Sequence, residues 1–381
     1  MKLEKQLRLL VLATSVTLAA CTTSPPQPTA SALKYSASNW DMLPQWNSMD
    51  IAQSWPAFLQ SCSVLKNKPH WQDVCAAAGN VPQDDSAAQR AFYQQWFTPY
   101  QLFNPDGTDQ GTITGYYEPL LKGSRVKTRR FRYPLYGVPD DLLTIDLGDV
   151  YPQLKGMRLR GRLDGNRVVP YYDRAAIDAG VPTLKKHVLF WVDDPVALFF
   201  LQIQGSGRIQ LPDGSTVKVG YADQNGQPYV SVGRKLVEAG AFPLEEASMQ
   251  RIKEWASKHP RKLDAMLEQD PSFVFFRELP DGIAAPIGAL GIPLTSKYSL
   301  AVDTSTIPLG APVFLSTTEP ETTTPLNRLM LAQDTGGAIR GAIRADFFWG
   351  YGEDAAELAG RMKQQGRMWV LLPKGDPPTI N

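Results

Sequence analysis

The chain has 381 residues, 43% hydrophobic and 20% charged, a composition ordinary for a globular protein and a length that allows two domains. Its formal net charge is +1, so no broad electrostatic field indicates nucleic acid as a partner. A near-neutral surface instead suits a ligand such as carbohydrate, which is bound by stacking and hydrogen bonds. The 30 Gly and 31 Pro residues indicate many turns and short strands.

The N-terminus has the form of a secretory signal. A basic leader at residues 2–8 precedes an apolar run at residues 9–20 that is too short to remain as a membrane-spanning helix. The run ends in Leu-Ala-Ala-Cys at Cys21, which resembles the lipobox of bacterial lipoproteins; an ordinary signal peptidase site is the alternative. We therefore expect a signal peptide at residues 1–20 and acylation of Cys21.

Residues 21–39 are then expected to form a lipidated tether, because their Thr-, Ser- and Pro-rich start has no folding capacity. Position 22 is Thr22 rather than the Asp that retains lipoproteins in the inner membrane. Outer-membrane lipid is thus the expected anchor, with the protein facing the periplasm. Acyl chains gain about 0.8 kcal/mol per buried methylene, which is enough for stable anchoring.

Residues from about Trp40 to Phe103 are predicted to be helical. Apolar residues recur at helical spacing from Ile51 to Leu65, and a start signal at residues 84–86 opens a second such run.

The cysteines and histidines limit the chemistry. Cys62 and Cys75 either pair in a disulfide, as an oxidising periplasm permits, or remain two buried thiols, and the sequence leaves both open. His70, His187 and His259 are far apart and lack ligand spacing. Neither a structural zinc site nor a His-based triad is therefore expected.

From Gly111 the sequence becomes strand-like. Residues 112–117 contain alternating β-forming residues, and turn signals then recur about every ten residues, which is typical of a β-barrel or sandwich. These turn signals are Pro139-Asp140, Gly165-Asn166, Pro212-Asp213-Gly214 and Asn225-Gly226.

A helical segment is predicted from Pro243 to about Gln269, broken by Pro260. Strands follow it, and a late helix is expected from Glu353 to Gln365, with Gly366 beyond its end as a cap. The strand-like segments are residues 272–276, 300–302, 312–315, 329–332 and, last, 368–372.

Three aspartates in the C-terminal third, Asp303, Asp334 and Asp346, lie in short Gly-rich or aromatic contexts next to apolar runs. A carboxylate placed there can point from a rigid strand into a cleft. The residues after Asp346 are Phe-Phe-Trp, whose rings can exclude water and so raise a carboxyl pKa, as a general acid requires near neutral pH. A turn or a helix cap is the ordinary role of one such aspartate, but three together favour a site.

Seven stretches of the sequence, in this order, resemble the MltA family of murein-degrading, membrane-bound lytic transglycosylases. They are residues 115–119, 199–207, 219–222, 271–276, 300–303, 333–339 and 345–350. The resemblance extends from about Tyr100 to the C-terminus. The three-aspartate segment alone also occurs in other cell-wall proteins.

The resemblance implies a mainly β fold with a helical N-terminal region. It consists of a double-psi β-barrel domain and an inserted second β-barrel-like domain, with a groove between them. The implied bounds are residues 40–119 and 272–381 for the catalytic barrel with its N-terminal helices, and residues 120–271 for the insertion.

The resemblance also implies roles for individual residues. Asp346 would be the single catalytic acid, and Asp334 and Asp303 would shape the site and its electrostatics. The groove residues expected to bind glycan are Tyr116, Tyr117, Glu118, Gln202, Gln204, Gly205, Ser206 and Gly207.

The implied activity is that of a carbon–oxygen lyase, an exolytic transglycosylase. It would cleave the β-1,4 bond between N-acetylmuramic acid and N-acetylglucosamine and leave 1,6-anhydromuramic acid ends during cell-wall turnover.

No cofactor or metal is expected. The expected partners are peptidoglycan strands, outer-membrane lipid and a cell-wall synthase or scaffold protein. A two-carboxylate glycoside hydrolase and a non-catalytic glycan-binding lipoprotein are the alternatives. The residues alone leave open exolytic against endolytic action and any need for peptide stems.

Overall fold

The computed structural model describes residues 35–376 except positions 156, 158 and 284. The predicted signal peptide, the lipidation site Cys21 and most of the tether therefore lie outside the described residues. The predicted end of the tether at residue 39 is wrong, because β1 (Tyr35–Ala37) already pairs with a strand of the main sheet.

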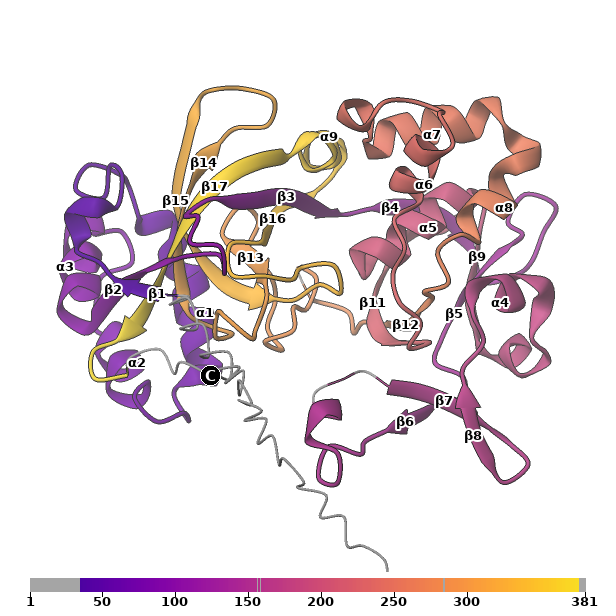
Figure 1. Ribbon diagram of the computed structural model, residues 1–381, viewed down its shortest axis with the longest axis horizontal. Coiled ribbons are helices and arrows are strands. Elements are labelled where there is room, and N and C mark those ends of the chain that lie inside the picture. Colours follow the sequence, from indigo (N-terminus) through magenta and orange to yellow (C-terminus); the bar gives the residue numbers. More distant parts are fainter. Residues whose placement is uncertain (1–34, 156, 158, 284, 377–381) are drawn as a thin grey trace, which may run out of the picture.

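Three helices cover one side of the molecule: α1 (Trp55–Leu65), α2 (Gln72–Ala78) and α3 (Ser86–Trp96) (Figure 1). The predicted start signal is confirmed, since the Asp85 carboxylate accepts a hydrogen bond from the Ala88 N–H at 2.9 Å. The prediction that helix continues to Phe103 is wrong. The strand-forming segment Phe97–Leu102, which contains a proline, forms β2 and pairs with both β1 and the last strand of the chain.

Cys62 on α1 and Cys75 on α2 form a disulfide, with their Cα atoms 5.3 Å apart. The sequence left open a disulfide or two buried thiols, and the structure contains the disulfide.

Eight strands form the main sheet, in the order β1-β2-β17-β14-β15-β13-β16-β3, and a further pairing of β17 with β3 closes six of them into a barrel. The long strand β17 makes this closure, because one half pairs with β14 and β2 and the other with β3. The strands not yet bounded are β3 (Gly111–Glu118), β13 (Ser299–Val302), β14 (Pro312–Thr318), β15 (Pro325–Asp334), β16 (Ala345–Tyr351) and β17 (Lys363–Pro373).

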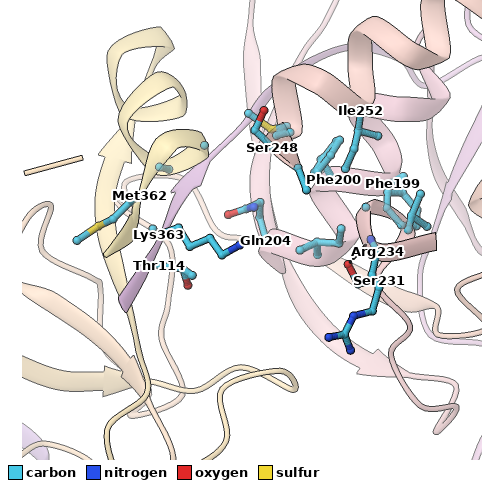
Figure 2. Close-up of a pocket in the computed structure, with 18 of the residues that line it drawn as sticks. Thr114, Phe199, Phe200, Gln204, Ser231, Arg234, Ser248, Ile252, Met362 and Lys363 are labelled. Atoms are coloured by element: carbon cyan, nitrogen blue, oxygen red, sulfur yellow. Dashed lines mark hydrogen bonds between the residues drawn. The ribbon is translucent and has the colours of Figure 1, made fainter. Parts of the chain in front are cut away.

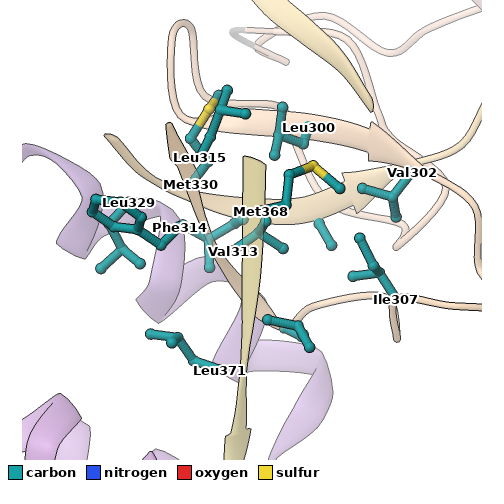
Figure 3. Packing of buried hydrophobic residues seen from close by; sticks show 14 of the residues in the cluster. Leu300, Val302, Ile307, Val313, Phe314, Leu315, Leu329, Met330, Met368 and Leu371 are labelled. Carbon is teal, nitrogen blue, oxygen red and sulfur yellow. The ribbon is translucent and has the colours of Figure 1, made fainter. Parts of the chain in front are cut away.

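The interior of this barrel is apolar. Leu300, Val313 and Met368 lie on three different strands and point into one cluster, as Figure 3 shows. The same cluster continues into α1 through Trp55 and Phe58, which are fully buried. The barrel therefore provides a rigid support for side chains on its outer face.

A late helix, α9 (Glu353–Arg361), follows β16, but the prediction that it reaches Gln365 with Gly366 as its cap is wrong. Residues 363–366 instead pair with residues 111–114 of β3. Strand pairing at the closure of the barrel overrides the local helical pattern there.

An inserted unit lies between β3 and β13, on the side of the barrel opposite α1–α3 (Figure 1). Its six-stranded sheet has the order β12-β11-β10-β4-β9-β5, and its three-stranded sheet the order β6-β7-β8. The bounds are β4 (Leu120–Ser124), β5 (Tyr133–Tyr136), β6 (Leu143–Ile145), β7 (Leu159–Asp164), β8 (Arg167–Pro170), β9 (Val188–Val192), β10 (Ser206–Gln210), β11 (Thr216–Gln224) and β12 (Val274–Glu278).

The predicted boundary between insertion and catalytic domain at residue 271 is too early. β12 pairs with β11, so residues through Glu278 belong to the inserted sheet. The predicted break at Pro260 is confirmed, since it separates α7 from α8. The helices of the insertion are α4 (Arg174–Gly180), α5 (Pro195–Gln204), α6 (Val232–Glu238), α7 (Met249–Lys258) and α8 (Leu263–Leu267).

Within the described residues, no helix combines the length and the apolar character needed to cross a membrane.

Candidate active site

A single row of paired residues crosses five strands of the barrel. Asp334 on β15 pairs with Ala301 on β13, Ala301 pairs with Asp346 on β16, and Asp346 pairs with Thr114 on β3. Thr114 in turn pairs with Lys363 on β17. Directly paired residues project from the same face of a sheet, so this row presents two carboxyl groups on either side of the small Ala301 side chain.

Asp346 lies at the centre of the row. Its Oδ1 accepts a hydrogen bond from Thr114 Oγ1 at 2.7 Å. Burial raises the pKa of the Asp346 carboxyl above its ordinary value, and the opposing effects of the Arg344 charge and the Thr114 hydrogen bond do not cancel it. Burial therefore shifts the equilibrium of Asp346 toward its protonated form, the form that can donate a proton.

Asp334 is held firmly by its neighbours. Its Oδ2 accepts a hydrogen bond from the Tyr116 hydroxyl at 3.0 Å, and its Oδ1 accepts one from the Ala289 N–H at 3.0 Å. Burial raises its pKa to about 6 against these hydrogen bonds, and the nearby charge of Asp346 adds to the rise. The titrations of Asp334 and Asp346 are thus coupled.

Asp303 has a different environment from the other two aspartates. Burial opposes ionisation of this carboxyl, but hydrogen bonds from the Gly341 N–H at 2.7 Å and the Ser305 N–H at 3.0 Å outweigh it and lower its pKa. Arg340 also lies 3.9 Å away. Asp303 therefore remains an anion that ties down the segment leading to Asp346.

Two cavities of about 470 Å³ each flank the row. In the first, Thr114 and Lys363 on the barrel face Phe200 and Ile252 of the insertion (Figure 2). The second lies between Asp334 and the segment where α5 leads into β10. Ile203 and Gln204 line both cavities. Since Thr114 lines one cavity and Asp334 the other, the row places Asp346 between them.

The three predicted groove residues of β3 have different positions. Tyr116 is buried and reaches the site through its hydrogen bond to Asp334. Tyr117 lines the first cavity. Glu118 is 2% exposed and forms an ion pair with Arg208 at 2.7 Å, so its carboxylate stabilises the junction between barrel and insertion. It lines neither of the two cavities.

The predicted groove residues from Gln202 to Gly207 lie at the end of α5. Gln204 Oε1 accepts a hydrogen bond from the Tyr117 N–H at 3.1 Å, which joins the insertion to β3. Gly205 ends the helix at φ +76°, a conformation that glycine adopts without strain, and Gln202, Gly205 and Ser206 line the second cavity. Gly207 lines neither cavity; a Cβ there would lie 2.9 Å from the Pro119 carbonyl oxygen, so it permits close packing.

Thr114 and Lys363 were not predicted from the sequence. Alternation with Tyr116 along the strand could have identified Thr114, but the register that brings Lys363 to the same row was not readable from a segment predicted as helix. The described part of the chain contains no group of three or more His, Cys, Asp or Glu side chains that could hold a metal ion.

Comparison with known families gives two matches. Residues 112–277 match the MltA specific insert domain, and residues 298–372 match the 3D domain. These ranges correspond to the inserted unit together with β3 and to the C-terminal part of the barrel.

Individual proteins and structures agree with these matches. The membrane-bound lytic murein transglycosylase A of Escherichia coli K12 is 33% identical over 279 residues, covering 71% of this chain and 68% of that protein. MltA from Neisseria gonorrhoeae has a TM-score of 0.78 at 42% identity, covering 91% of this chain and 94% of that one. E. coli MltA with bound chitohexaose has a TM-score of 0.68 at 27% identity, covering 89% and 94%.

Proposed function

Because this chain belongs to the MltA family and is a peptidoglycan-degrading lytic transglycosylase, we propose that Asp346 alone serves as its general acid and then its general base. The supporting observation is the position of Asp346. Its carboxyl has a raised pKa, accepts a hydrogen bond from Thr114 and lies between two cavities on a rigid strand.

In the first step, protonated Asp346 donates its proton to the oxygen linking N-acetylmuramic acid to N-acetylglucosamine. The bond from muramic C1 to that oxygen breaks, and an oxocarbenium-like or oxazolinium-like species forms. Acid catalysis of this kind contributes roughly 10²- to 10⁴-fold.

In the second step, the C6 hydroxyl oxygen of the same sugar bonds to C1, and its proton passes to the Asp346 carboxylate. This closes the 1,6-anhydro ring and restores the acid, so atoms and charge balance without water. The nucleophile is already tethered, and well-oriented intramolecular reactions reach effective molarities on the order of 10⁵ M or more.

Asp334 supports this chemistry rather than activating a water molecule. Both of its oxygens already accept hydrogen bonds, from Tyr116 and Ala289. Its negative charge, when present, disfavours a second charge on Asp346 and so helps to keep the acid protonated.

We assign the closed sheet to a double-psi β-barrel and the two cavities to one glycan-binding groove between barrel and insertion. The shared residues Ile203 and Gln204 support continuity between the cavities. That an E. coli relative binds chitohexaose supports a saccharide as the ligand.

We further propose that acylated Cys21 anchors the enzyme in the outer membrane, facing the periplasm. The membrane-bound name of the relatives supports this location. Replacing Cys21 with Ala should then prevent labelling of the protein with radioactive palmitate and release it from the membrane fraction.

Mass analysis of a digest tests the reaction. Purified sacculi are incubated with the form that begins after Cys21, and the released muropeptides are identified by mass. The proposal predicts 1,6-anhydromuramic ends, which are lighter than reducing ends by one water. Reducing ends as the main product would instead indicate hydrolysis.

A further inference from the structure

The first cavity has an electrostatic character that the glycan backbone does not explain. Its lining includes two cations, Lys363 from the barrel and Arg234 from α6, and no Asp or Glu. The remaining walls are largely apolar, with Phe199, Phe200 and Ile252 among them. Arg234 has the Glu238 carboxylate nearby, but a chain of N-acetylglucosamine carries no charge, so this sugar alone would leave Lys363 without a counter-ion.

Lys363 is placed for recognition rather than for structure. It is exposed, and its ammonium has no hydrogen-bond or ion-pair partner within the described part of the chain. Figure 2 shows the side chain extending from β17 toward Gln204 on the opposite wall. An unpaired lysine at the mouth of a cavity without acidic lining is available to a ligand carboxylate.

The strand pairing of the barrel determines how far Lys363 lies from the proposed acid, Asp346. Lys363 pairs with Thr114, and Thr114 pairs with Asp346, so the lysine lies two strands from the acid, on the side away from Asp334. Neighbouring strands are about 4.8 Å apart, so the two backbones are separated by roughly 10 Å. A group attached to the sugar beside Asp346 can reach that position.

Muramic acid carries such a group. Its O-lactyl side chain ends in a carboxyl that is either free or linked to a peptide stem, and the stem bears carboxylates of its own. We propose that the first cavity is a subsite for the carboxylate-bearing side chain of muramic acid, with Lys363 as its counter-ion and Arg234 as the second cation on the far wall. This assignment rests on the proposed function, because it names the part of the substrate that the same site recognises.

Lys363 does not act on the catalytic acid directly. The cation whose charge lowers the pKa of Asp346 is Arg344, whereas Lys363 lies two strands away from that carboxyl. Substitution of Lys363 should therefore change KM and leave kcat and the pH profile of cleavage unaltered.

A binding experiment in the Asp346→Asn background tests the subsite independently of catalysis. Three ligands are titrated: peptide-bearing glycan strands, strands freed of peptides by an amidase, and chitohexaose, which has no carboxylate. Lys363→Gln should weaken binding of the peptide-bearing strands by roughly 1.5-fold to fivefold, as expected for an exposed ion pair, with a reduced salt dependence. Chitohexaose binding should not change, and Lys363→Arg should restore the affinity.

The amidase-treated strands distinguish the source of the carboxylate. An effect of Lys363→Gln that is lost on them assigns the peptide stem, whereas an effect that persists shows that the lactyl carboxylate, which the amidase frees, can take the place of the stem carboxylate. Lys68→Gln, at an exposed lysine after α1, is the matched control and should alter none of the affinities.

Equal weakening of chitohexaose and strands would overturn the assignment, as would unchanged affinity for every ligand. If the Asp346→Asn protein with Lys363 intact bound none of the three ligands, the proposed function itself would be contradicted. A defect confined to Lys363 variants cannot be confused with that outcome.

Discussion

Asp346 and Asp334 have the same side chain and lie on the same face of the barrel, yet their carboxyl groups differ in hydrogen bonding. Asp334 is hydrogen-bonded through both oxygens, whereas the single described hydrogen bond to Asp346 comes from Thr114. Among the described residues one Asp346 oxygen has no hydrogen bond, as the proposed role of general acid requires, and the role proposed for Asp334 is to contribute its charge.

The coupling between the two carboxyls predicts the effect of Asp334→Asn on the pH profile. The charge of Asp346 raises the pKa of Asp334, and by reciprocity the charge of Asp334 raises that of Asp346. Removing it should lower the pKa of Asp346, and because the acid must be protonated, the alkaline limb of kcat/KM should move to lower pH. An alkaline limb that stays in place or moves upward would contradict this coupling.

The same substitution should change stability in a pH-dependent way. A carboxyl whose folded pKa is raised from 3.8 to about 6 stabilises the fold when protonated, and that contribution is lost as the pH rises through about 6. Asp334→Asn should therefore increase the free energy of unfolding by roughly 1–3 kcal/mol at pH 7. Urea unfolding at pH 7 and at pH 4 measures this; a variant less stable than wild type at pH 7 would refute it.

The sequence predicted the environment of a residue correctly where its neighbours in the chain determine that environment. The aromatic run after Asp346 predicted a buried acid, and the structure raises the pKa of that residue by burial. Thr114 and Lys363 were missed because their role depends on pairing between strands far apart in the chain. Glu118 was predicted to bind glycan, but its partner Arg208 lies 90 residues away and was not readable from the motif.

At the scale of elements, the barrel depends on close contact between β3 and α9. Gly115 on β3 has no side chain, and a Cβ there would lie 2.7 Å from Trp349 Nε1 and 2.8 Å from the Ala359 Cα. The glycine therefore allows α9 to pack directly on the strand that carries Thr114.

Gly115→Ala should consequently displace α9 or β3 and destabilise the protein by roughly 1–3 kcal/mol, as overpacking does. Activity should also fall, since Thr114 is the adjacent residue. Gly107→Ala is not a suitable control, because its φ of +82° would add strain; Gly337→Ala, where a Cβ would meet nothing within 4 Å, is better for stability. Equal stability of the Gly115 and Gly337 variants would show that the contact is unimportant.

The disulfide between α1 and α2 is a second element-scale feature. It closes a loop of 13 residues, for which the chain-entropy model gives about 3 kcal/mol. Replacing Cys62 and Cys75 together with Ala should lower the free energy of unfolding by roughly 2–4 kcal/mol. Thermal unfolding with and without reductant measures it: reductant should destabilise the wild type and not the variant, and insensitivity of both would contradict the prediction.

Several elements were predicted correctly and others were not, for identifiable reasons. The start of α3 was predicted correctly because its capping residue, Asp85, is recognisable in the sequence. β2 and the start of β17 were taken for helix because their strand character comes from pairing with strands far away in the chain. β2 pairs with β1 and with the end of β17, and the start of β17 pairs with β3. α5 was missed within a region of short strands, although Asp194 before Pro195 and Gly205 at its end are helix-boundary signals.

At the scale of the whole molecule, the site depends on the insertion as much as on the barrel. The barrel supplies the two carboxyls, while the insertion supplies the opposite walls of both cavities. The Tyr117–Gln204 hydrogen bond and the Glu118–Arg208 ion pair join the units close to the acid. Periodicity predicted the abundance of strands; the division into barrel and insertion followed from the family resemblance, because alternation along a strand does not say which sheet the strand joins.

The proposed mechanism depends on proton transfer by the Asp346 carboxyl. The most direct test compares Asp346→Asn with wild type in the digestion of sacculi at neutral pH, after equal unfolding temperatures have shown that the variant is folded. We predict that release of 1,6-anhydromuropeptides falls by at least about 10²- to 10⁴-fold while binding to sacculi persists. Release by the folded variant at a rate within tenfold of wild type would contradict the claim.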